Sequence, residues 1–145
     1  KRQDMYCMRN TTQGQGPEDL CDAKVGESVA QVGDFIGVNP DEKAMADTLT
    51  QTGPISVCLN ANLLQYYVSG IFDPPAWMCD PTGLDHAVLM VGYGSENGTD
   101  FWSIKNTWGE SWGEKGYFRI RRGTGCCGIN ALAALGTIVK NPKSL

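Results

Sequence analysis

His86 and Asn106 are the two residues whose types and spacing best suit acid–base chemistry. His86 is the only histidine, and it follows Asp85 at the head of an apolar run, where it can meet solvent and substrate. Histidine changes its charge near physiological pH. The side-chain carbonyl of Asn106 can accept a hydrogen bond from one imidazole nitrogen, which leaves the other nitrogen facing a nucleophile. A single histidine is more often a structural residue, and Asn106 shifts the interpretation towards catalysis.

Two tryptophans follow Asn106 within segment 106–113, which reads Asn-Thr-Trp-Gly-Glu-Ser-Trp-Gly. A tryptophan over a histidine–asparagine hydrogen bond would keep water from competing for that bond. Taken singly, Trp108 and Trp112 are better explained as core aromatic residues. The shielding role therefore depends on the neighbouring pair.

Six cysteines stand at positions 7, 21, 58, 79, 126 and 127. Their spacing contains no Cys-x-x-Cys, and His86 has no neighbouring cysteine or second histidine, so we expect no metal and no cofactor. So many cysteines in a short chain favour disulfides formed in an oxidising compartment. Two sequons, at Asn10 and Asn97, point to the same secretory route and to glycosylation, although sequons also arise by chance.

The charge and hydropathy of the chain exclude some classes of partner. The net charge is −4 and no basic cluster is present, which argues against nucleic acid. No apolar run approaches the length of a membrane span. Lys1 to Asp4 are polar, so we expect no signal peptide and interpret Lys1 as a processing boundary or an artificial one.

The elements that must position these residues can be inferred from hydrophobic patterning. Residues 1–38 are expected to be loop with a short strand near 29–35. A helix is expected next, capped by Asn39, with Pro40 at its first position and Glu42 completing a capping box; Gly53 ends it. We expect a helical turn at 62–68 and a loop at 72–85. Predicted strands cover 55–59, 86–93, 101–105 and 117–121, which gives an α+β class dominated by a short-stranded antiparallel sheet or barrel.

Together these segments resemble the papain/cathepsin family of cysteine proteases. Five motifs follow the family order: GPISV at 53–57, DHAV and VGYG at 85–94, IKNTWGESWG at 104–113, GY at 116–117 and CGI at 127–129. Segment 122–130 looks most like the cathepsin L/F branch. The resemblance implies that residues 1–145 are the C-terminal, β-barrel-like portion of the two-domain papain fold. Within it, residues 1–38 would be a loop-rich leading segment and 39–145 the β-rich domain that carries histidine and asparagine.

The resemblance also implies a role for each matched position. His86 matches the catalytic histidine, Asn106 the asparagine that orients it, and the backbone at Asp85 the place where substrate main chain binds. Thr107 stands where the family usually has serine, a departure that leaves the chemistry intact. The other matched positions are the shielding tryptophans, Trp108 and Trp112, and the lining of the main specificity pocket, Leu84, Cys58, Ala87 and Leu132.

The family's nucleophile is missing from the sequence. That cysteine lies in a Cys-Gly-Ser-Cys-Trp type segment, with a glutamine just before it for the oxyanion, and no such segment occurs here. The family spacing places it well upstream of Lys1. We therefore expect that an upstream chain or segment supplies the nucleophile, and that the 145 residues alone are inactive. No occluding insertion precedes His86, which favours endopeptidase action on peptide or protein substrates.

Two alternatives to a working protease stay open at this point. The chain could belong to a catalytically dead homologue with another residue at the nucleophile position, or it could be a fragment with a binding or structural role. The presence of His86, Asn106 and both tryptophans favours a working protease, because a dead homologue has no chemical need for an oriented histidine. A lysosomal, vacuolar or secreted location fits the cysteines and sequons. By resemblance, Cys79 pairs with Cys127, and the partner of Cys21 lies upstream.

Overall fold

A computed structural model describes residues 32–138 of the chain, and residues 32–137 form one compact unit. The strand expected near 29–35 begins outside this range; its described part belongs to a strand at Val32–Gly37. Asn10, Cys7 and Cys21 also lie outside the described residues. Within residues 32–138, no helix has both the length and the apolar character needed to cross a membrane.

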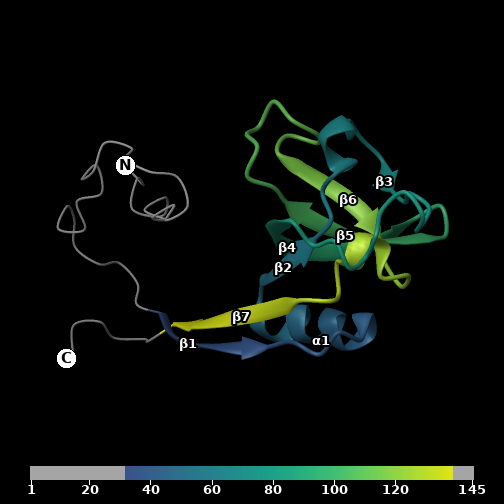
Figure 1. Cartoon of the computed structure of the whole chain (residues 1–145). Coiled ribbons are helices and arrows are strands. Elements are labelled where there is room, and N and C mark those ends of the chain that lie inside the picture. Colours follow the sequence, from purple (N-terminus) through teal and green to yellow (C-terminus); the bar gives the residue numbers. More distant parts are fainter. Residues whose placement is uncertain (1–31, 139–145) are drawn as a thin grey trace, which may run out of the picture. The chain divides into compact units, whose positions relative to one another are not determined.

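One sheet of seven strands organises the described residues, in the order β1-β7-β2-β4-β5-β6-β3 (Figure 1). The pairs β2–β4, β2–β7, β4–β5 and β5–β6 are antiparallel, whereas β3–β6 is parallel. A mainly antiparallel sheet with one α-helix confirms the α+β class. The strands are β1 (Val32–Gly37), β2 (Ile55–Leu59), β3 (Ile71–Phe72), β4 (His86–Glu96), β5 (Thr99–Lys105), β6 (Tyr117–Arg121) and β7 (Ala133–Ile138).

The core follows the alternation that the sequence predicts for the strands. In β4, Val88 and Met90 are buried while Ala87 and Leu89 are exposed. Strands β5 and β6 bury every second residue in the same way. Helix α1 (Glu42–Thr52) covers this core with its apolar side. The principal buried side chains are Met45, Ala46, Leu49, Val88, Met90, Trp102, Ile104, Phe118 and Ile120.

The start of helix α1 differs from the prediction. Asp41, not Asn39, is the N-cap, and its carboxylate accepts a hydrogen bond from the backbone N–H of Ala44 at 2.8 Å. Asn39 instead accepts from the N–H of Asp41 at 2.9 Å, a local turn that competes with capping. The predicted capping box was therefore wrong. Gly53 ends the helix as expected, with φ +98° and its N–H bonded to the carbonyl of Leu49.

Glu42 has a long-range role in place of the predicted capping box. Its carboxylate accepts the indole N–H of Trp102 at 2.7 Å and the backbone N–H groups of Gly123 and Gly125 at 2.7 and 2.6 Å. It thereby ties the first turn of α1 to β5 and to the loop after β6. Because the partners are more than 50 residues away, capping rules based on local spacing could not identify this role.

Two strands were not predicted. β3 (Ile71–Phe72) has only two residues, of which Phe72 falls in the segment 72–85 that was predicted to be a loop. β7 has the sequence Ala-Ala-Leu-Gly-Thr-Ile, and alanine and glycine are depleted in strands, so it lacks the usual signal. It pairs with β2 through Ser56 opposite Ala134 and Val57 opposite Ala133. Tertiary pairing thus decides its conformation.

Candidate active site

Strand pairing brings His86 and Asn106 together although 20 residues separate them in the sequence. His86 is the first residue of β4, and Asn106 follows the last residue of β5. Because β4 and β5 are antiparallel, the start of one lies beside the end of the other. Asp85, just before β4, accepts a hydrogen bond from the N–H of Ala61 at 2.8 Å, and its own N–H bonds to the carbonyl of Leu59. These bonds fix the point where the chain enters β4.

The two side chains form a direct hydrogen bond, as the sequence predicts. His86 Nε2 lies 2.9 Å from Asn106 Oδ1. The amide oxygen can only accept, so Nε2 carries the proton and Nδ1 of the neutral ring is free to accept another. Asn106 is only 7% exposed, and its Oδ1 also accepts the N–H of Thr107 at 2.8 Å. The backbone N–H of Asn106 is bonded to the carbonyl of Gly116 at 2.9 Å.

Trp108 lies against His86, and Trp112 lies behind Trp108. The ring of Trp108 stacks on the imidazole of His86, with 5.0 Å between centroids and 28° between planes. Trp112 meets Trp108 edge to face at 4.9 Å and 80°. Trp108 covers one face of the imidazole. It is itself 38% exposed, so its other side is in contact with solvent. Shielding of the His86–Asn106 bond by the two tryptophans stays a prediction.

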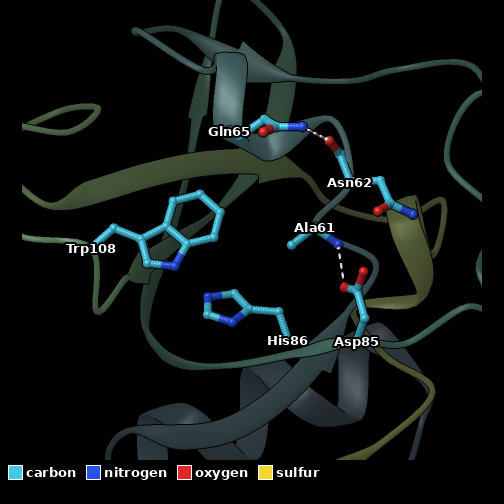
Figure 2. A pocket seen from close by; sticks show the side chains of 6 residues that line it. All are labelled: Ala61, Asn62, Gln65, Asp85, His86 and Trp108. Atoms are coloured by element: carbon cyan, nitrogen blue, oxygen red, sulfur yellow. Dashed lines mark hydrogen bonds between the residues drawn. The ribbon is translucent and has the colours of Figure 1, made fainter.

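An open cleft of about 280 Å³ lies in front of the imidazole (Figure 2). Figure 2 shows the indole of Trp108 on one side of the cleft, and the 3-10 turn at Leu64–Tyr66, which carries Gln65, above the indole and the imidazole. Within that turn, the side chain of Gln65 donates to the carbonyl of Asn62 at 2.9 Å. Sequence reasoning missed three of the lining residues, because only a short helical turn marks their segment: Ala61, Asn62 and Gln65.

None of the four residues assigned to the specificity pocket lines this cleft. Cys58 and Ala87 are register partners in β2 and β4, and the N–H of Cys58 bonds to the carbonyl of Leu132 at 3.0 Å. Leu132 is 58% exposed. Leu84 is half-buried and lies just before β4 begins. The structure thus brings the backbones of Cys58, Ala87 and Leu132 side by side.

The predicted disulfide is confirmed, since Cys79 is bonded to Cys127. Cys58 and Cys126 are free thiols. Burial, together with the nearby carboxylates of Asp73 and Glu42, raises the pKa of Cys126 to about 12. A thiol with such a pKa is not a thiolate at neutral pH, so Cys126 is not suited to be a nucleophile.

Among residues 32–138, no group of histidine, cysteine and acidic side chains could hold a metal ion.

The fold and this histidine–asparagine–tryptophan arrangement define a part of a cysteine peptidase of the papain type. The family described as "Papain family cysteine protease" matches residues 2–137, and the chain belongs to that family. It is 40% identical to mouse cathepsin F over 124 residues and 38% identical to mouse cathepsin W over 134 residues, covering 86% and 81% of this chain. These matches cover 27% and 36% of the two cathepsins, so the chain spans about a third of the length of such relatives.

Solved structures give the same result. The digestive procathepsin L2 proteinase of Tenebrio molitor larval midgut superposes with a TM-score of 0.75 at 37% identity, over 81% of this chain and 38% of that one. Bromelain from Ananas comosus, in complex with the E64 inhibitor, superposes with a TM-score of 0.72 at 35% identity, over 81% and 55% of the two chains. These neighbours confirm that the described residues are the C-terminal portion of a papain fold.

Proposed function

We propose that this chain supplies the histidine and asparagine of a cysteine endopeptidase, whose nucleophilic cysteine and oxyanion glutamine come from an upstream chain or segment. The observation that carries the proposal is the 2.9 Å bond between His86 Nε2 and Asn106 Oδ1, which leaves Nδ1 available for a thiol. None of the six cysteines stands in the family's nucleophile motif. Membership of the papain family supports the class of reaction.

The proposed mechanism assigns proton transfer to His86. The thiol proton passes to Nδ1, and the resulting thiolate and imidazolium stabilise each other. The thiolate adds to the peptide carbonyl, and His86 then protonates the amine nitrogen as the C–N bond breaks. A water molecule, deprotonated by the same imidazole, releases the acyl group and restores the thiol. In this proposal the departing amine is held in the cleft that Trp108 and Gln65 line.

Complementation tests this proposal directly. The 145-residue chain alone is expected to hydrolyse no peptide, because it lacks a thiolate beside His86. Co-expression with the upstream segment should restore hydrolysis and labelling of one cysteine by a thiol-directed epoxide. Hydrolysis by the pure chain, with labelling of one of its own cysteines, would contradict the proposal. Serine at the upstream nucleophile position would instead favour a catalytically dead homologue with a binding or structural role.

The substrate preference is a second part of the proposal. The pocket for the residue second before the scissile bond would be lined by Leu84, Cys58, Ala87 and Leu132, none of which carries a charge. An uncharged pocket favours apolar side chains, at about 0.8 kcal/mol for each buried methylene, while a charged side chain would lose its water without a partner. Because Leu132 is bulky, we expect leucine or valine to be preferred over larger aromatics.

Replacing Leu132 with glutamate should make the pocket accept arginine. A peptide library cleaved by the reconstituted enzyme measures this preference in the wild-type and L132E proteins. A wild-type preference for arginine or lysine at that position would show that the pocket is assigned to the wrong residues.

Glycosylation of Asn97 is the third part of the proposal. Asn97 is exposed and has φ +51° in the tight turn between β4 and β5, followed by Gly98 at φ +76°. Such a turn presents the side chain to a modifying enzyme. Treating the native protein with an amide-cleaving glycosidase should lower its intact mass, and Asn97→Gln should remove most of that shift. An unchanged mass would contradict glycosylation at both Asn97 and Asn10, and with it one support for a lysosomal, vacuolar or secreted location.

A further inference from the structure

The turn that follows Trp112 is anchored by one carboxylate. Glu114 Oε1 accepts the N–H of Gly70 at 2.9 Å and Nη2 of Arg119 at 2.8 Å, and its Oε2 accepts Nε of Arg119 at 3.0 Å. The side chains of Arg119 and Glu114 are only 21% and 28% exposed. Forked, charge-assisted bonds of this kind are stronger and more directional than neutral ones. Glu114 therefore fixes the turn to β6 on one side and to the loop at Gly70 on the other.

The backbone of this turn needs such an anchor. Lys115 has φ +57°, and it lies between Gly113 at φ +56° and Gly116 at φ +87°. A side chain in the left-handed region carries a conformational cost, so that conformation persists only where neighbouring contacts determine it. At Gly113 a Cβ atom would lie 2.6 Å from the carbonyl oxygen of Tyr117, which shows how closely the turn approaches β6.

The two ends of the turn contact the two partners of His86. At one end, the ring of Trp112 lies against Trp108, which stacks on the imidazole. At the other end, the carbonyl of Gly116 accepts the backbone N–H of Asn106 at 2.9 Å. Movement of this turn would therefore displace both the indole that covers His86 and the amide that holds its Nε2.

We propose that Glu114, held by two hydrogen bonds from Arg119, is a positioning residue for the His86–Asn106 pair. It acts through the turn and touches neither ring. The contacts described above support the positioning of His86 and Asn106 by Glu114, and only the effect on catalysis rests on the proposed function. Bonds from Arg119 hold the pKa of Glu114 below its usual value, so the carboxylate that anchors the turn stays ionised in mildly acidic solution.

The test compares Glu114→Gln with Glu96→Gln in the complete natural polypeptide that carries these residues. Glu96 also bonds to Arg119 through Nη1, but it is the last residue of β4, and within the described residues its carboxylate bonds to no residue of the turn. The readout is the exchange rate of the His86 Nε2 proton with water, measured by ¹⁵N NMR and assigned through the loss of its signal in His86→Gln. Glu114→Gln should accelerate this exchange about tenfold or more, the factor expected when a charge-assisted hydrogen bond is lost. Glu96→Gln should leave it within about twofold of wild type.

Kinetics provide the second arm of the test. If the polypeptide is a peptidase, Glu114→Gln should lower kcat about tenfold with KM nearly unchanged, because substrate contacts stay in place while the base is misaligned.

Should Glu114→Gln fail to fold, Arg119→Lys, which keeps the charge but loses the fork, should give the same faster exchange. Unchanged exchange in a folded Glu114→Gln or Arg119→Lys protein, or equal acceleration by Glu96→Gln, would overturn the inference. Absence of activity in the wild-type protein would count against the proposed function alone.

Discussion

Replacing His86 with alanine in the proposed peptidase should lower kcat/KM about 10⁴-fold, the upper end of what one general acid–base group contributes. The loss is this large because His86 would both hold the thiol proton and deliver it to the leaving amine. The Nε2 bond to Asn106 and the stacked Trp108 leave only Nδ1 for that task. Steady-state kinetics on an apolar peptide substrate, together with a count of epoxide-reactive sites, measures the effect.

Asn106→Ala should have a smaller effect, about 10²-fold, because the imidazole remains but is no longer held in one tautomer. The loss should fall on kcat more than on KM. Asn39→Ala is a suitable control, since within residues 32–138 the side chain of this exposed asparagine bonds only to the backbone N–H of Asp41. An Asn106→Ala enzyme with wild-type kcat, or a His86→Ala enzyme that still forms the epoxide adduct at the wild-type rate, would contradict the assigned roles.

Sequence patterns were most informative where they reflect burial in a strand. Segment 117–121 alternates apolar and polar residues, and β6 spans the same five residues. Segment 101–105 forms the larger part of β5. The pairing of His86 with Asn106 could be proposed because a hydrogen-bond acceptor, two tryptophans and a histidine at the head of a strand belong to one chemical arrangement. The structure adds the 2.9 Å separation and the identity of the bonded nitrogen.

Other features depend on contacts that local patterns do not encode. Asp41 caps α1, while the side chain of Asn39 bonds to the N–H of Asp41. Both residue types are good N-caps, so spacing in the sequence does not show which of the two begins the helix. Strand β7 forms from residues of low strand propensity because β2 offers it a partner edge. The cleft residue Gln65 is positioned by a single 3-10 turn, which has no distinctive sequence signal. No sequence pattern around Glu114 indicates the three N–H groups that bond to its carboxylate, one from Gly70 and two from Arg119.

Removal of the Cys79–Cys127 disulfide should lower the free energy of unfolding by about 3–4 kcal/mol, the chain-entropy value for a loop of this length. The bonded residues are 48 positions apart, and the loop between them contains β4, β5, β6 and the His86–Asn106 pair. The carbonyl of Cys127 also accepts the N–H of Asn60, the residue just before the cleft residue Ala61, at 2.9 Å. Urea unfolding of the Cys79→Ala/Cys127→Ala protein measures the loss.

The double variant is needed because Cys126 lies next to the bond. Its Sγ is 3.8 Å from Sγ of Cys127, so a protein lacking Cys79 alone would leave two thiols in contact that could oxidise to each other. Cys58→Ala is the matched control: it also removes one sulfur but breaks no cross-link, and it should change the free energy of unfolding by no more than about 1 kcal/mol. If the double variant lost no more stability than Cys58→Ala, the disulfide would not be what holds the loop before His86 to the C-terminal segment.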